Sequence, residues 1–355
     1  MTTATRGSVG SAHTRVEGRD KVTGAARYAG EIPFAELAHG WLVLSTVARG
    51  RVRALDTEAV LGMPGVLAVL HHQNAPRLDT DYAGLMGMAP DPSIALFQHD
   101  RVAHLGWPVA LVVAETSEQA REAAESLLVH YDQEPHDVAF SAERQTEAYA
   151  LDGHMPAVVE KGDLEAEIAA SAVVLDAEYT TPEEHHNPME PHAAMARWEG
   201  GRLEVVDSNQ GTIWVVGELA NLFSLDPASV RVRSEHVGGG FGSKGVRAHQ
   251  VGAVMAATVL QRPVRVVMTR RQMFSLAGYR SPTAQRVRLG ADVDGRLRAL
   301  EHRSLNLTST VHEFVEPSGA ASRSMYAADA HHTASRLVRL DVPTPTWMRA
   351  PGEAS

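Results

Sequence analysis

Apolar residues along the first 140 positions come in short runs separated by polar turns, a pattern typical of alternating strands and helices. The clearest helix follows the capping box Thr116-Ser-Glu-Gln119, because alanines and leucines then recur at helical spacing up to Leu128. The sequence therefore predicts one α/β unit over about 16–138, with strands at 41–47, 66–70 and 109–114, a short helix at 57–61 and a long loop at 73–98.

A polar connection at 139–156 has no strong periodicity, and we expect a domain boundary there. Strands and helices alternate again beyond it, and two strands pair across the turn at Gly200-Gly201. The predicted elements are strands 172–179, 194–198 and 203–207, helix 212–225, strand 230–237, helix 246–261, strand 264–268, helix 270–276 and a hairpin of 285–293 with 296–306.

Length and charge narrow the class of protein. A chain of 355 residues has room for about two domains. A net charge of −10 argues against a nucleic-acid partner, which needs a basic face. The chain has no cysteine, which excludes disulfides, cysteine-ligated iron–sulfur clusters and a cysteine nucleophile within it. No apolar run reaches the roughly 18 residues of a membrane span, and the first residues lack the apolar core of a signal peptide.

The glycine-rich segment Gly238-Gly-Gly-Phe-Gly-Ser-Lys244 is the strongest candidate for chemistry. Glycines let backbone N–H groups approach an anion closely, and the following helix adds the positive end of its dipole. The segment Ser208-Asn-Gln-Gly-Thr212 lies at a second strand-to-helix turn nearby. One alternative stays open, in which the loop is a plain glycine turn and Phe241 folds back into the core.

A second interpretation of the loop is a dinucleotide site. Gly240-Phe-Gly-Ser-Lys-Gly245 matches GxGxxG between a strand and a helix, and Thr269-Arg270-Arg271 at the next strand end would suit a 2′-phosphate. Against this, the motif belongs at the first strand of its unit, whereas a strand and a helix precede it here.

The segment Thr181-Pro-Glu-Glu-His-His-Asn-Pro-Met-Glu-Pro-His192 is rich in possible metal ligands. Its three prolines break any helix, and no HExxH pair occurs. We therefore expect a rigid loop whose histidines and glutamates bond to the backbone.

Taken in order, these segments resemble the molybdenum-binding subunit of the xanthine dehydrogenase and aldehyde oxidase family. The segment 15–28 is similar to the family's start, and Met348-Arg-Ala-Pro-Gly352 supplies a fourth ordered motif. The resemblance covers nearly the whole chain. It implies an α/β (α+β) fold, in which a hammerhead-like domain at 14–139 precedes the first molybdopterin-binding domain at 156–355, truncated at its end.

The resemblance also implies site residues for a molybdenum–molybdopterin cofactor, in its plain or its cytosine dinucleotide form. Gln210 would place its amide near the oxygen ligands of the metal, Phe241 and Gly242 would lie at the apical oxo group, and Arg349 would border the metal. None of these would be a direct ligand, and Gly239 and Gly240 would complete the cofactor-binding loop.

The implied activity is hydroxylation of an aldehyde or an N-heterocycle. The family's general-base glutamate is expected beyond Ser355, so no catalytic residue is nominated and the chain alone is expected to be inactive. Purine-oxidising members tend to carry glutamate where this chain has Gly245, which argues against a purine substrate. The resemblance implies iron–sulfur and FAD partner subunits, and because the chain has no cysteine the 2Fe–2S clusters are expected on a separate chain.

We expect the protein in the cytoplasm, or in the periplasm if a partner that carries a signal exports it. Two alternatives to a molybdenum hydroxylase remain from the sequence. One is an NADP-binding dehydrogenase that uses Gly240, Gly242 and Gly245, and the other is a non-catalytic half-subunit that only binds the cofactor.

Overall fold

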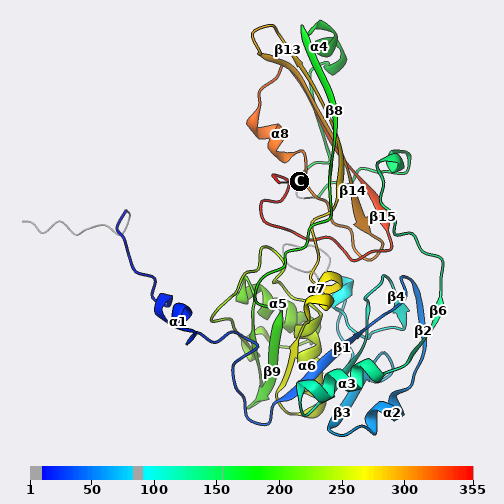
Figure 1. Cartoon of the computed structure of the whole chain (residues 1–355), viewed down its shortest axis with the longest axis vertical. Coiled ribbons are helices and arrows are strands. Elements are labelled where there is room, and N and C mark those ends of the chain that lie inside the picture. Colours follow the sequence, from blue (N-terminus) through cyan, green and yellow to red (C-terminus); the bar gives the residue numbers. More distant parts are fainter. Residues whose placement is uncertain (1–9, 83–90, 154, 355) are drawn as a thin grey trace, which may run out of the picture.

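The computed structural model describes residues 10–82, 91–153 and 155–354. A broad body with helices on its sheet forms the lower part of the molecule, and a long narrow sheet rises from it (Figure 1). An N-terminal segment that contains α1 (Gly18–Thr23) extends away from the body, and no residue of this helix is buried.

A mixed sheet of seven strands forms the body. Strands β10, β11, β12 and β1 point the same way, because β9 runs antiparallel to both β10 and β12 while β10–β11 and β12–β1 are parallel pairs. The order across the sheet is β11 (Val230–Arg233), β10 (Arg202–Asp207), β9 (Ala193–Glu199), β12 (Val264–Val267), β1 (Ala38–Leu44), β5 (Pro108–Ala114) and β3 (Val66–His71).

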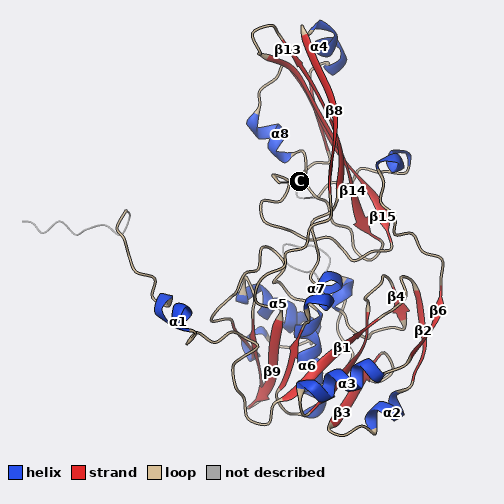
Figure 2. Ribbon diagram, viewed as in Figure 1, coloured by secondary structure: helices blue, strands red, loops and turns tan. Residues whose placement is uncertain are grey.

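Helices cover both faces of this sheet (Figure 2). Strand β5 shows why, since Leu111 packs in the core beneath α6 (Ala248–Leu260) while its neighbour Val112 packs on the opposite face with α3 (Ser117–Ser126). Successive side chains of a strand point to opposite faces, so a strand covered on both sides is apolar throughout. The other helices of the body are α2 (Thr57–Leu61), α5 (Thr212–Leu222) and α7 (Arg270–Leu276).

The upper sheet has five strands in the order β7 (Val158–Lys161), β15 (Ala330–Leu340), β14 (Leu297–Ser309), β13 (Thr283–Ala291) and β8 (Val173–Thr181). Helices α4 (Leu164–Ala170) and α8 (Ala320–Met325) accompany it. A small sheet at the side of the body contains β4 (Arg101–Val102), β2 (Gly50–Leu55) and β6 (Val129–Gln133). Short 3₁₀ turns lie at Pro92–Ile94, Ala142–Thr146 and Pro227–Ser229.

Several predicted elements are confirmed. The side chain of Thr116 caps α3 by accepting from the backbone of Gln119, and the Gln119 side chain bonds back to Thr116. The hairpins β9–β10 and β13–β14 form antiparallel pairs as expected. Of the long loop predicted at 73–98, residues 83–90 lie outside the described part.

Several predicted boundaries were wrong; the strand expected at 41–47, for example, runs from Ala38 to Leu44. The strand expected at 230–237 ends at Arg233, because the next side chain, Ser234, accepts from the backbone N–H of Asn209 and turns the chain toward the neighbouring loop. The helix expected at 212–225 ends at Leu222, and Ser224 then takes a left-handed backbone conformation. The helix expected at 246–261 begins only at Ala248.

Strand β15 was missed because two of its six buried positions, Thr333 and Ser335, are polar and interrupt the apolar pattern. The hydroxyl of Ser335 lies 2.9 Å from that of Ser304 on β14, and Asn306 donates to it at 3.2 Å. A hydrogen-bonded polar interior does not show the apolar alternation from which strands are predicted. Strands β2, β6 and β7 and helices α4 and α8 were missed as well.

The seven-stranded sheet crosses the boundary expected at 139–156. Strands β1, β3 and β5 come from before it, and β9 to β12 come from after it. Leu42, Leu111 and Val254 belong to one continuous core, so the two halves of the chain share a hydrophobic core.

Candidate functional site

The loops that follow β10 and β11 lie at one edge of the seven-stranded sheet, because these strands are parallel. Residues 208–211 connect β10 to α5, and residues 234–247 connect β11 to α6. The segment 182–192 reaches the same edge, since it leads into β9, which is antiparallel to β10. Three motif segments therefore meet where the strands end, the usual place of a ligand site in such sheets.

Gln210 is fixed by the glycine-rich loop. Its Oε1 accepts from the backbone N–H groups of Gly242 at 3.0 Å and Lys244 at 3.3 Å, and its own N–H donates to the Lys244 carbonyl at 2.9 Å. Two N–H donors require the oxygen of the amide at this position, which orients the NH₂ group the other way. No acceptor among the described residues lies within hydrogen-bonding distance of that NH₂ group, and the residue is exposed.

The crest of the glycine-rich loop presents unused donors. Among the described residues, no acceptor is within reach of the backbone N–H groups of Gly239, Gly240 and Phe241. Gly239 has φ +95° and Phe241 has φ +56°, so the loop curves through left-handed conformations. Successive N–H groups in such a curve form a concavity that suits an anion.

Gly242 is required by a close approach of two chain segments. A Cβ built on it would lie 2.0 Å from the carbonyl oxygen of Trp347, and its φ is +109°. The same carbonyl accepts from Nε2 of the buried His186 at 2.8 Å. The glycine-rich loop, the segment 182–192 and the segment before Arg349 are thus packed against one another.

Arg349 joins this group through backbone and side chain. Its N–H donates to the Phe241 carbonyl at 2.9 Å, and its guanidinium lies over the Phe241 ring at 5.9 Å. No carboxylate of the described residues pairs with this guanidinium. The buried Arg280 holds the segment from behind by donating to the carbonyls of Met348, Arg349 and Ala350. An exposed cation therefore lies beside the free N–H groups.

A buried ion pair lies beneath the loop. Lys244 donates to Glu190 Oε2 at 2.8 Å, and the side chains of these two residues are 0% and 9% exposed. Ser208 Oγ and the N–H of Gly238 donate to the same oxygen at 2.7 and 2.6 Å. Burial lowers the pKa of Lys244, and the neighbouring Glu190 opposes this shift.

Burial shifts the pKa of three titratable side chains below this pair toward the uncharged form. Burial raises the pKa of Asp207 to about 6, although Gln250 and Asn209 donate to its carboxyl oxygens. Burial lowers the pKa of His192 to about 3, and it lowers the pKa of His249 well below its usual range. At neutral pH the two histidines under the loop are therefore neutral.

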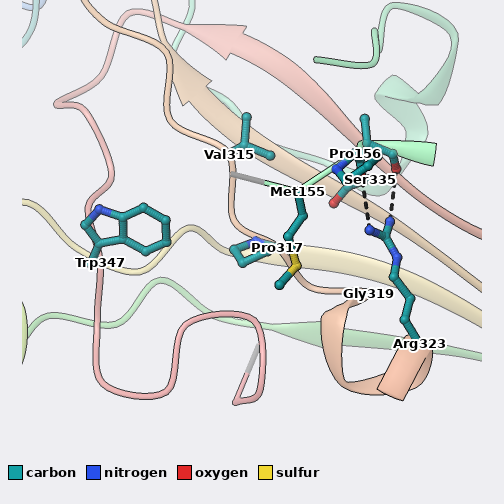
Figure 3. A pocket seen from close by; sticks show the side chains of 9 residues that line it. Met155, Pro156, Val315, Pro317, Gly319, Arg323, Ser335 and Trp347 are labelled. Carbon is teal, nitrogen blue, oxygen red and sulfur yellow. Dashed lines mark hydrogen bonds between the residues drawn. The ribbon is translucent and has the colours of Figure 1, made fainter. Parts of the chain in front are cut away.

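The pocket drawn in Figure 3 lies behind the site and is separate from it. Its lining includes Met155, Pro317, Arg323 and Trp347. In this pocket the Arg323 guanidinium donates to the Pro156 carbonyl at 2.9 Å. None of the six predicted site residues lines this pocket. The pocket touches the site only through Trp347, whose carbonyl meets Gly242.

The six predicted site residues, Gln210, Gly239, Gly240, Phe241, Gly242 and Arg349, lie together around the glycine-rich loop. The alternative that Phe241 folds back into the core was wrong, because this residue is 41% exposed. The Arg349 guanidinium lies over the Phe241 ring, and a Cβ built on Gly239 would lie 3.1 Å from the same ring.

The dinucleotide interpretation fails on the local geometry. A Rossmann turn passes directly from strand to helix so that the phosphates meet the helix N-terminus. Here β11 ends at Arg233 and α6 begins at Ala248, and the intervening loop packs against Gln210 and Trp347. Arg270, which the dinucleotide interpretation assigns to a 2′-phosphate, instead donates to the Met189 carbonyl at 3.4 Å.

Sequence reasoning missed the residues that hold the site from below. Glu190 and Lys244 belong to recognised motifs, and one acidic and one basic residue in two motifs that meet at the same edge were a usable signal for a buried pair. Arg280 gave no such signal, because a single arginine between two predicted elements has no distinguishing context. Only the folded chain brings it within reach of the carbonyls of 348–350.

The described residues hold no group of three or more histidine, aspartate or glutamate side chains placed to bind a metal ion. Side chains of the cluster at 181–192 instead form hydrogen bonds within the protein, as His186 and Glu190 do with backbone groups. Within 10–82, 91–153 and 155–354, no helix is long and apolar enough to span a membrane.

Comparison with known proteins identifies two family domains. Residues 23–135 match the aldehyde oxidase and xanthine dehydrogenase a/b hammerhead domain, and residues 148–355 match the molybdopterin cofactor-binding domain. The aldehyde oxidoreductase molybdenum-binding subunit PaoC of Escherichia coli K12 is 38% identical over 353 residues, which is 98% of this chain and 46% of that protein. The nicotinate dehydrogenase large molybdopterin subunit of Eubacterium barkeri is 27% identical over 82% of this chain and 69% of its own length.

Solved structures share the fold. Quinoline 2-oxidoreductase from Pseudomonas putida 86 superposes with a TM-score of 0.82 at 24% identity, over 97% of this chain and 46% of that one. Aldehyde oxidoreductase from Desulfovibrio gigas gives 0.80 at 24% identity, over 95% and 39%. This chain spans about half the length of PaoC. The chain belongs to the aldehyde oxidase and xanthine dehydrogenase family and contains matches to its hammerhead domain and its molybdopterin cofactor-binding domain.

Proposed function

We propose that this chain is part of a molybdenum hydroxylase and that the loop at 238–244 holds the molybdopterin cofactor. The observation that carries the proposal is the gathering of unused donors at one place. The N–H groups of Gly239, Gly240 and Phe241, the NH₂ of Gln210 and the guanidinium of Arg349 belong to residues gathered at the glycine-rich loop, and Gln210, Phe241 and Arg349 are exposed. These groups suit a cofactor with anionic and oxygen-rich parts.

Each residue has a separate task toward the cofactor. The backbone donors of the loop bind its anionic portions, and the Gln210 amide donates to its oxygen atoms from a position set by Gly242 and Lys244. Phe241 and Arg349 form a wall that excludes bulk water. When bound, the cofactor supplies the redox centre that takes two electrons from the substrate. No side chain of the described residues is proposed as a direct metal ligand.

The substrate we propose is an aldehyde. PaoC, which is 38% identical, is named as an aldehyde oxidoreductase. Gly245 leaves open space beside the loop, since a Cβ there would meet nothing within 4 Å. No carboxylate is therefore available at this position to bind the polar ring of a purine.

The finer assignments are proposals as well. We propose the cytosine dinucleotide form of the cofactor, iron–sulfur and FAD partner subunits, and a cytoplasmic location. The absence of cysteine supports separate partners, because iron–sulfur clusters need thiolate ligands. We also propose 14–139 and 156–355 as the domain limits. The general base is proposed to lie outside the residues of this chain.

Metal and pterin analysis tests the function. The chain is purified after co-expression with its gene neighbours, and molybdenum, pterin and NADP are measured in the same sample. Molybdenum and pterin in equal amounts, with aldehyde-dependent reduction of a dye, are expected. NADP without molybdenum would overturn the proposal.

Variants of the loop refine the test. Gln210→Ala removes the oriented amide, and we expect it to lower the molybdenum content. Arg271→Ala is the matched control, because this exposed side chain belongs to the dinucleotide interpretation and, among the described residues, no hydrogen bond or ion pair joins it to the glycine-rich loop. A loss of bound molybdenum in the control but not in Gln210→Ala would contradict the assignment.

A further inference from the structure

One carboxylate oxygen joins all three loops of the site. Glu190 Oε2 accepts from Ser208 in the loop after β10, and from both Gly238 and Lys244 in the glycine-rich loop, at 2.6 to 2.8 Å. Glu190 itself belongs to the segment before β9. We call Glu190, Ser208, Gly238 and Lys244 the Glu190 clasp.

The clasp closes the glycine-rich loop at both ends. Gly238 is its first residue and Lys244 its last, and both donate to the same oxygen. The contact with Gly238 is reciprocal, because the N–H of Glu190 donates to the Gly238 carbonyl at 3.1 Å. The backbones are so close that a Cβ on Gly238 would lie 2.5 Å from Cβ of Glu190. Any movement of this carboxylate therefore changes the curvature of the loop.

The charge of the clasp is needed for its geometry. A single oxygen that receives an ammonium, a hydroxyl and a backbone N–H must carry negative charge, since charge-assisted bonds are the strong ones. The Lys244 side chain is 0% exposed, and among the described residues Glu190 is its only ion-pair partner. A neutral isostere at position 190 leaves a buried cation uncompensated.

We infer that Glu190 is a positioning residue that sets the direction of the free N–H groups of Gly239, Gly240 and Phe241. Its importance for a cofactor rests on the proposed function, whereas its effect on the loop does not. Its carboxylate holds the two ends of the loop together, so the crest between them is curved outward. The same clasp holds Lys244, whose backbone bonds on both sides to Gln210.

Hydrogen exchange tests this inference without any cofactor. In Glu190→Gln we expect the hydrogen-bonded amides of the loop, those of Gly238, Gly242, Ser243 and Lys244, to exchange about ten-fold faster than in the unsubstituted chain. The matched control is Glu301→Gln, which removes a fully buried carboxylate that pairs with Arg288 and His332 in the five-stranded sheet. Both variants lose thermal stability, but only the first changes exchange in the loop. Equal changes in both, or a change of less than about two-fold in Glu190→Gln, would overturn the inference.

Two further variants cover the case in which Glu190→Gln fails to fold. Ser208→Ala removes one donor and is expected to raise loop exchange about three-fold. The double variant E190Q/K244Q leaves no lone buried charge, so its stability recovers while loop exchange stays fast. If the double variant recovers both its stability and slow loop exchange, Glu190 contributes to stability alone, which would contradict its role as a positioning residue.

Molybdenum content separates the two proposals. If loop exchange rises in Glu190→Gln and the purified complex also loses molybdenum several-fold, the result supports both the proposed function and the positioning role of Glu190. If loop exchange responds but no preparation contains molybdenum, the proposed function fails while the positioning role of Glu190 holds.

Discussion

Gly242 and Gly245 lie three residues apart in one loop, but an added methyl group meets different surroundings at each. At Gly242 it would overlap the Trp347 carbonyl at 2.0 Å, and at Gly245 it meets nothing within 4 Å. The difference comes from a segment about a hundred positions away in the sequence. The need for glycine at a given position is therefore a property of the folded chain as well as of the local turn.

Replacing Gly242 by alanine is expected to cost about 3 kcal/mol or more, because the clash adds to a backbone conformation that alanine tolerates poorly. Gly245→Ala is the matched control and is expected to change stability by less than about 0.5 kcal/mol. Urea unfolding midpoints measure both. Equal midpoints for the two variants would contradict the packing described for Trp347.

The lowered pKa of His192 predicts that the folded chain loses stability in acid. Burial lowers its pKa to about 3, whereas in the unfolded chain a histidine titrates near about 6.5. Below pH 6.5 the unfolded state binds a proton that the folded state does not, so stability is complete above this pH and falls as the pH drops toward 3.

The variant His192→Gln isolates this contribution. Its amide can still donate to the Ser243 carbonyl, which His192 Nε2 approaches at 3.3 Å, but it does not titrate. Unfolding midpoints at pH 7 and pH 5 are expected to differ less in the variant than in the unsubstituted chain. The same difference in both chains would exclude His192 as a source of the pH dependence.

At the scale of elements, the C-terminal segment is held mainly through its carbonyl groups. Arg280, at the start of the strand hairpin, donates to the carbonyls of Met348, Arg349, Ala350 and Ala354. Gly352 donates to Oε1 of the buried Glu316 at 2.8 Å. The segment 348–354 has no regular structure, and the side chains of Arg280 and Glu316 thus hold its shape. This shape places Arg349 beside Phe241.

Arg280→Met removes the donor to these carbonyls and is expected to release the segment. Trypsin should then cut after Arg349 several-fold faster, which the loss of a short C-terminal peptide in the mass spectrum reports. Arg286→Met is the control, because among the described residues that exposed side chain pairs only with Asp176. Equal cleavage rates in both variants would show that Arg280 does not hold the segment.

At the scale of the whole molecule, the two family domains share one sheet. Strand β1 of the first pairs in parallel with β12 of the second, from Ala38 opposite Val264 onward. Ala38, Leu111, Val254 and Val264 belong to the same buried cluster. Each half alone would expose an unpaired strand edge and an apolar face.

We therefore expect residues 1–139 and 140–355 to aggregate when expressed separately and to form a complex when expressed together. Size-exclusion chromatography and co-purification through a tag on one fragment measure this. A monomeric first fragment with a cooperative unfolding transition of its own would contradict the shared core.

The sequence by itself determined the elements whose signals are local. The capping box at Thr116, the hairpin turn at Gly200-Gly201 and the order of the motif loops follow from residue types at short spacing. The six site residues are a prediction from the resemblance. The tertiary structure alone decided which surfaces the two halves share, how Glu190 closes the loop and why Gly242 cannot carry a side chain. These features depend on contacts between residues far apart in the chain, and neither periodicity nor turn propensity carries information about such contacts.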